Sequence, residues 1–187
     1  MGIGHPAIGR DVGTRKLLSM LGLVSQKTRT AEGLAGVLQH AVPDARISVE
    51  EFHPAWINVD ASEPMPLGQN CLLGRGFYDR GNAVRIIMLP QTRESVLGLL
   101  PGRVNHREVL ALLRLYLGFS ACAHLEMHVA PQLMPAQLMN SDQVSLGYTT
   151  QLPSLHMQDA TAPPTRVQLG RWSGDSDAVG DAKPLTH

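Results

Sequence analysis

The chain has 187 residues, of which 43% are hydrophobic, and its 16 Lys and Arg balance its 16 Asp and Glu. The length suits one domain with or without a tail, and the balance leaves no net field to attract nucleic acid or an anionic membrane. No apolar run approaches the roughly 20 residues of a membrane span, the N-terminus has no signal-peptide core, and Cys71 and Cys122 are too few for a disulfide scaffold. We therefore expect a soluble protein in a reducing, intracellular setting.

The first elements of the chain are predicted to be helices. Residues 1–13 are rich in Gly and are expected to be flexible. Thr14 is a suitable N-cap for a short helix, and Thr30 for a second one. Pro43 ends the second helix. Its apolar residues follow helical spacing: Leu34, Val37, Leu38 and Ala41.

Strands follow the helices. Residues 46–50 alternate polar and apolar side chains, and a second short strand is predicted over 56–59. The Pro-containing segment 60–68 is typical of a loop. Residues 72–78 and 83–89 are predicted to be the arms of a β-hairpin joined by a four-residue turn. The second arm is almost continuously apolar, which indicates a strand buried on both faces.

Two further helices are predicted over 91–99 and 105–117. In the longer one Asn105 is expected to be the N-cap and Glu108 to complete a capping box. Gly118 is placed to end this helix in the left-handed conformation. The predicted apolar stripe consists of Val109, Leu110, Leu113 and Leu117.

A strand predicted over 121–130 places His124, Glu126 and His128 on one face. Two histidines four residues apart on a helix can bind zinc, but the metalloprotease pattern needs Glu directly after the first His, where this chain has Leu125. We interpret the three residues as a polar strand face that meets solvent or a partner. A metal-dependent hydrolase centred on them remains an alternative.

The end of the chain changes in composition. Residues 131–143 are predicted to be a loop and 146–152 a short final segment. Residues 153–187 lack Ile and Phe and are rich in Pro and Gly, which predicts a disordered tail with Trp172 as its one possible anchor. The expected fold class is α+β: one domain over 14–152 with short antiparallel strands, a hairpin, several helices and irregular loops.

Arginines are concentrated between residues 75 and 114, where seven Arg stand against three acidic residues. A nucleic-acid-binding module that uses this stretch is therefore a second alternative, although duplex binders usually have a clearly basic domain. No nucleophile elbow, dinucleotide fingerprint or phosphate-binding loop is complete in the sequence. We predict no catalytic residue, no metal and no cofactor.

An ordered series of short motifs resembles a known family. The series is TRTAEGL at 28–34, FHPAW at 52–56, LG at 67–68, LGRGFYD at 73–79, LLPG at 99–102 and LGYTTQL at 146–152. Their order and spacing resemble the C-terminal half of the TssG family (also called ImpH or VasB), the wedge subunit of the type VI secretion system baseplate. The resemblance implies a non-enzymatic protein in the cytoplasm, assembled at the inner face of the bacterial inner membrane.

The resemblance also implies partners. Family members join TssF and TssE in a wedge and dock trimers of the adaptor TssK through loops, without binding nucleic acid or inserting into the membrane. Candidate docking loops are 60–68 and 131–143, and the apolar side chains in them either meet a partner or tuck onto the protein's own core. The candidate partner-binding residues are Met65, Leu67, Arg75, Arg80, Leu133, Met134, Leu138, Met139 and Tyr148.

The chain departs from the family pattern in three places. The family's N-terminal half is expected before Met1, two Trp of the closing segment are Tyr148 and Gln151 here, and 153–187 has no counterpart in the family. A half-subunit without its partners is expected to expose surface that they normally cover. We therefore expect the isolated protein to be poorly soluble or to self-associate.

Overall fold

The computed structural model of this chain describes residues 15, 18–19, 22, 29–58, 76–118, 121–134, 145, 147–149 and 163–174. The fold is α+β, as predicted. The elements in chain order are α3 (Ala31–Ala41), β1 (Ala45–Glu50), β2 (Ala55–Asn58), β3 (Gly76–Asp79), β4 (Ala83–Pro90), α4 (Arg93–Gly98), α5 (Val104–Leu117), β5 (Cys122–Val129), the 3-10 turn η1 (Pro131–Leu133) and β6 (Thr165–Ser173). None of the described helices is long and apolar enough to cross a membrane.

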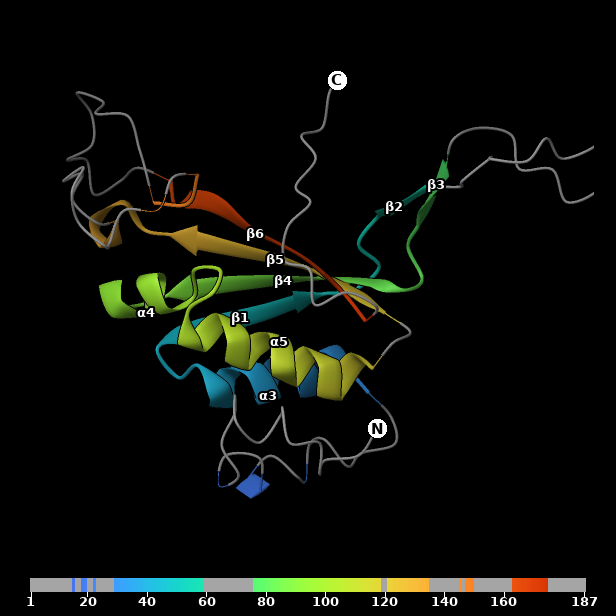
Figure 1. The fold of residues 1–187 in the computed structure, drawn as a ribbon, viewed down its shortest axis with the longest axis horizontal. Helices are drawn as coiled ribbons and strands as arrows, with labels where there is room; N and C mark the ends of the chain where they lie inside the picture. The colour runs from blue at the N-terminus through green and yellow to red at the C-terminus, as the bar shows by residue number, and fades with distance from the viewer. Residues whose placement is uncertain are drawn as a thin grey trace, which may run out of the picture.

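The strands form two separate sheets (Figure 1). A four-stranded sheet has the order β1-β4-β5-β6, in which β4 and β5 are parallel and the outer pairs are antiparallel. Strands β2 and β3 form an antiparallel ribbon that projects away from the main sheet. Helices α3 and α5 lie together on one side of the four-stranded sheet, with α4 beside them.

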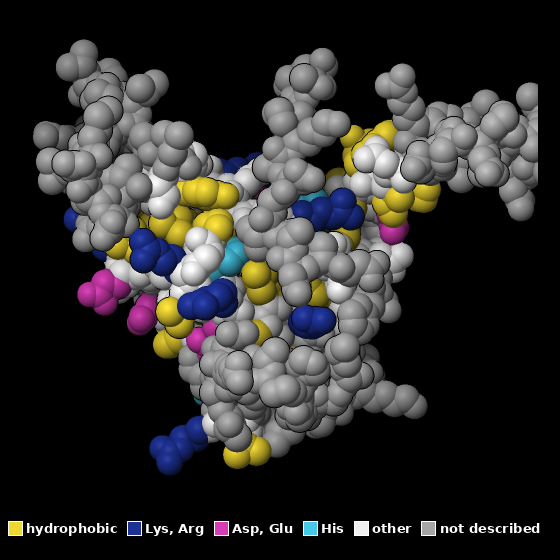
Figure 2. Space-filling model, in the orientation of Figure 1, with side chains coloured by type: hydrophobic (Ala, Val, Ile, Leu, Met, Phe, Trp, Pro, Cys, Tyr) yellow, Lys and Arg dark blue, Asp and Glu magenta, His cyan; other side chains and the backbone are white. Residues whose placement is uncertain are grey.

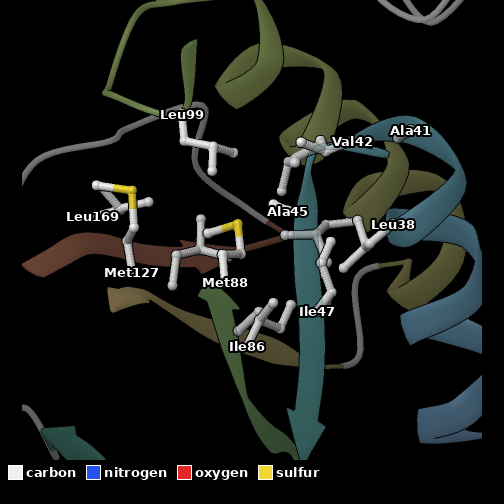
Figure 3. Close-up of a cluster of buried hydrophobic side chains, with 14 of the residues drawn as sticks. Leu38, Ala41, Val42, Ala45, Ile47, Ile86, Met88, Leu99, Met127 and Leu169 are labelled. Atoms are coloured by element: carbon white, nitrogen blue, oxygen red, sulfur yellow. The ribbon is translucent and has the colours of Figure 1, made fainter. Parts of the chain in front are cut away.

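The core lies between these helices and the four-stranded sheet. Alternate side chains of β4 and β5, such as Ile86, Met88 and Met127, point toward the helices and are almost fully buried. Figure 3 shows them converging with Leu38 of α3 and with Leu99, which follows α4. The apolar face of each element therefore meets that of another, as a two-layer domain requires.

Helix α3 begins and packs as predicted. The Thr30 hydroxyl accepts a hydrogen bond from the Gly33 N–H at 3.1 Å, and the four predicted apolar residues are all buried. The phenol oxygen of Tyr116 in α5 accepts from the Thr30 N–H at 3.2 Å and donates to the Thr30 carbonyl at 3.1 Å. A Cβ on Gly33 would overlap that oxygen, so the glycine is what lets α5 approach α3.

The free edge of β1 is occupied by a side chain of α3. The Gln39 amide donates to the Ala45 carbonyl at 2.6 Å, and its oxygen accepts from the Ile47 N–H at 3.2 Å. Strand β1 is an edge strand with β4 as its one neighbour, and these two backbone groups lie on its open side. Gln39 thus satisfies part of the β1 edge without another strand.

Helix α5 confirms its predicted end but not its predicted start. Gly118 follows its last residue with φ +68°, a backbone angle that favours glycine. The N-cap is Arg103 and makes no side-chain cap hydrogen bond, so the predicted capping box at Asn105 and Glu108 is wrong. Asn105 lies instead against Gly98 at the end of α4, and Glu108 is buried.

The buried stripe of α5 also differs from the predicted one. Val109 and Leu113 are buried as expected, but Leu110 and Leu117 are only partly buried. Leu112 and Tyr116 take their place, because the helix packs on α3 as well as on the sheet.

The predicted hairpin between 72–78 and 83–89 is wrong. Strand β3 pairs with β2, whereas β4 pairs with β1 and β5. In place of the predicted hairpin turn the chain bends at Gly81 and Asn82, where the Asp79 carboxylate accepts from the Gly81 N–H at 2.8 Å. The chain passes there from one sheet to the other because β4 has apolar side chains for an inner strand, whereas β3 carries two exposed aromatic residues.

The prediction that residues 153–187 are a disordered tail is wrong for 163–174. Residues 165–173 form β6, which pairs along the whole of β5. Val167, Leu169 and Trp172 are buried in the core, so the predicted anchor at Trp172 is confirmed. The folded domain therefore extends past 152, to Ser173 at least. The rest of the predicted tail and the predicted flexible segment 1–13 lie outside the described residues.

Candidate protein interface

The polar face of β5 holds a buried ion-pair network. Glu126 is 4% exposed, and its carboxylate accepts hydrogen bonds from Arg85 of β4 at 2.8 Å and from Arg166 of β6 at 2.9 Å. His128 lies 2.8 Å from its second oxygen, and Arg85 also contacts Glu50 of β1 at 3.0 Å. Because each neighbouring strand contributes one partner, the network ties the four strands together across this face. A buried carboxylate with several cationic partners is the arrangement that offsets desolvation.

This geometry does not favour a metal centre at the three predicted residues. Both oxygens of Glu126 are engaged by arginine guanidinium groups, whose charge repels a metal ion. The described contact of the His124 ring is with the His53 ring, with centroids 4.7 Å apart, and not with that carboxylate. Burial, followed by the charges of His53 and Arg171, lowers the pKa of His124 to about 4. In the described part of the chain no three metal-ligating side chains converge.

The arginines of the basic stretch do not form one groove. Arg85 lies on the polar face of the sheet, whereas Arg107 and Arg114 belong to α5, which packs on the opposite face. Arg93 donates to the Met134 carbonyl at 3.4 Å, and Arg80 is exposed at the turn after β3. The sheet therefore separates Arg85 from Arg107 and Arg114.

The predicted partner-binding residues fall into three groups. Leu133, Met134 and Tyr148 are partly buried and pack against the protein's own core, which was the alternative to contact with a partner. Arg80 stands in solvent. The other candidates lie outside the described residues: Met65, Leu67, Arg75, Leu138 and Met139.

A surface that the sequence analysis did not single out is the aromatic ribbon, which we define as β2 and β3 with Trp56, Phe77 and Tyr78. These side chains are 42%, 43% and 63% exposed. Trp56 and Tyr78 pair across one face of the ribbon with ring centroids 4.9 Å apart, and Phe77 pairs with Ile57 on the other face. Figure 2 shows hydrophobic side chains gathered at this projecting end of the molecule.

Local contacts hold the Trp56 ring in place on the ribbon. Its indole N–H donates to the Asn58 side chain at 2.7 Å. A Cβ on Gly76 would come within 2.8 Å of the indole ring, so the glycine makes room for it. Fixed, exposed aromatic side chains are the residues that most often anchor protein interfaces.

One more exposed aromatic residue precedes the ribbon. Phe52 is 66% exposed and has φ +58°, a left-handed conformation that is uncommon for a bulky residue. With the three ribbon residues it makes four exposed side chains among the seven Phe, Trp and Tyr that the structure describes. Exposure of more than half of the described aromatic residues is unusual for a domain that works alone.

The sequence held a signal for the ribbon. Trp56 and Ile57 are consecutive, as are Phe77 and Tyr78, so each short strand has apolar side chains on both faces. An isolated ribbon of two four-residue strands buries little of either face by itself. Both faces therefore remain available to contact another protein.

Comparison with known proteins agrees with this architecture. A family model described as "Type VI secretion, TssG" matches residues 1–153. No curated protein matches the sequence. Among solved structures, the chain is similar to one in a TssK-TssF-TssG baseplate subcomplex of the type VI secretion system, with a TM-score of 0.68, 24% identity, and coverage of 97% of this chain and 82% of that one.

A second similar structure comes from the baseplate complex of the type VI secretion system. Its TM-score is 0.60 at 22% identity, and the match covers 98% of this chain and 53% of that one. The TM-scores establish a shared fold, and the family model matches most of the sequence. The chain belongs to the TssG family of type VI secretion proteins.

Proposed function

We propose that this protein is a structural subunit of a type VI secretion baseplate and acts by binding neighbouring subunits rather than by catalysis. The observation that supports this role most directly is the aromatic ribbon, whose two apolar faces stand in solvent in a chain of the TssG family. Desolvation of exposed aromatic side chains is a strong source of binding energy between proteins.

The proposed partners are TssF and TssE in a wedge and TssK as a docked adaptor. Both similar solved structures are baseplate assemblies, and one of them contains TssK and TssF. We assign the ribbon to TssK, because the candidate loop 60–68, with Met65 and Leu67, lies between its two strands in the sequence. We place the assembly in the cytoplasm at the inner face of the inner membrane.

Co-purification of the tagged chain with co-expressed TssF and TssK tests this assignment. The double variant Trp56→Ala, Tyr78→Ala is expected to reduce TssK capture about tenfold or more, as loss of interface anchors does, while TssF capture is retained. Val104→Ala is the matched control, since Val104 is 64% exposed on α5, away from the ribbon. Equal capture of TssK by the double variant and the wild type would refute the assignment of the ribbon.

A further inference from the structure

The aromatic ribbon meets the four-stranded sheet at a joint of three side chains: His53, His124 and Arg171. His53 precedes β2, and its backbone N–H donates to the backbone carbonyl of Ala83, at the start of β4, at 3.0 Å. Its ring meets the edge of the His124 ring of β5 at an interplanar angle of 60°. The ribbon is therefore connected to two central strands of the sheet at the point where it leaves them.

Arg171 adds a contact from the C-terminal strand. It is the register partner of His124, and its guanidinium donates to the backbone carbonyl of Trp56 at 3.4 Å and to the Cys122 sulfur at 3.5 Å. The neighbouring residue, Trp172, is buried in the core on the other face of β6. That anchor fixes the direction in which Arg171 points, because side chains alternate along a strand.

The charge of Arg171 is not used for an ion pair with a described carboxylate. Arg85 and Arg166, on the same face, both contact Glu126, whereas Arg171 contacts a carbonyl and a sulfur. The carbonyl belongs to Trp56, one of the ribbon's own exposed aromatic residues. The contacts of Arg171 thus serve to hold one backbone segment in place.

We propose that Arg171, together with His53 and His124, positions the aromatic ribbon relative to the four-stranded sheet, so that β6 is part of the docking apparatus. This inference rests on the proposed docking role of the ribbon. A ribbon of two short strands loses conformational freedom when a partner orders it. Contacts that hold it beforehand lower that loss and raise the affinity.

Hydrogen exchange on the isolated chain tests the positioning role without any partner. Arg171→Ala is expected to speed exchange of the backbone amides of β2 and β3 by about threefold or more, with exchange in α5 unchanged. Arg171→Lys is expected to restore part of the protection, because an ammonium group can also donate to the Trp56 carbonyl. Gln168→Ala is the matched control, an exposed residue of β6 with no contact to the ribbon in the described structure.

Affinity for TssK is the second measurement. Arg171→Ala is expected to weaken binding about fivefold while the urea midpoint of the whole domain stays at the wild-type value. Unchanged exchange in β2 and β3 would overturn the positioning role, and so would faster exchange throughout the sheet and α5, the mark of a general stabilising residue. Faster exchange in the ribbon with unchanged affinity would overturn the link to docking. Failure of the wild-type chain to bind TssK would refute the proposed function but not the exchange result.

Discussion

Replacing Gly33 by Ala is expected to destabilise the native protein but to stabilise a variant in which Tyr116 has already been replaced by Phe. In the native protein the Tyr116 oxygen bonds both backbone groups of Thr30 and lies where a Cβ on Gly33 would stand. Gly33→Ala must displace that oxygen and break its two hydrogen bonds. Tyr116→Phe removes the oxygen, and the nearest atoms to the added methyl group are then the Thr30 hydroxyl at 3.3 Å and the ring carbon of residue 116 at 3.4 Å.

The magnitudes follow from the same contacts. Two hydrogen bonds to a buried phenol contribute roughly 2 kcal/mol in total, so Tyr116→Phe is expected to cost about that amount. Alanine is favoured over glycine inside a helix by about 1 kcal/mol. Gly33→Ala alone is therefore expected to destabilise the fold by about 1 kcal/mol, and to stabilise it by up to about 1 kcal/mol in the Phe background. The coupling energy is then about 2 kcal/mol.

Urea unfolding followed by circular dichroism measures the four proteins of this cycle, at a concentration where sizing shows a single species. Equal slopes of free energy against urea would allow the free energies to be compared directly. A Gly33→Ala effect of the same sign and size in both backgrounds would refute this account of how α3 is joined to α5.

Three further predictions concern the sheet. Glu126→Gln leaves the partly buried Arg85 and the exposed Arg166 without their shared buried counter-charge. It is expected to lower the free energy of unfolding by about 3 kcal/mol, and a loss below about 1 kcal/mol would contradict the buried network. Burial lowers the pKa of both His106 and His124, so the unfolded chain binds more protons. The free energy of unfolding is therefore expected to be highest above pH 6.5 and to fall as the pH decreases toward 4, by at most about 3 kcal/mol for His124. Urea titrations at several pH values measure this dependence, and His124→Asn is expected to flatten it. Truncation after residue 153 removes three buried apolar side chains of β6 and is expected to abolish cooperative thermal unfolding, whereas truncation after 174 retains it.

Elements defined by local spacing were predictable from the sequence. The helical spacing of Leu34, Val37, Leu38 and Ala41 identified the buried face of α3. The alternation along β5 placed His124, Glu126 and His128 on one face, as observed. In both cases the period of the backbone determines which side chains share a face, and that period needs no knowledge of distant residues.

Long-range pairing was not predictable in the same way. The residues of β6 that complete the core are three apolar positions in a Pro- and Gly-rich segment, and their strand partner lies about 40 residues earlier in the chain. The burial of Glu126 likewise depends on Arg166, whose strand the composition had placed in a tail. Short turn signals favoured pairing 72–78 with 83–89, but the choice of neighbour depended on which strand had apolar side chains for the sheet interior.

The candidate site was predictable only in part. The sequence indicated that loops would carry apolar side chains for partners, yet the clearest exposed surface in the described structure is the aromatic ribbon. Exposure of Trp56 and Tyr78 depends on how far the ribbon projects from the sheet, which no local pattern encodes.

The Gln39 side chain protects the edge of β1 from pairing with strands of other proteins. An unpaired strand edge can recruit a strand from any neighbour, and a subunit surrounded by copies of other proteins meets such strands constantly. By occupying two backbone groups of β1, the amide makes adventitious sheet extension at that rim unfavourable. The protein can thus be packed closely among neighbours without forming an intermolecular sheet through β1. Fibrous aggregation by that route is suppressed.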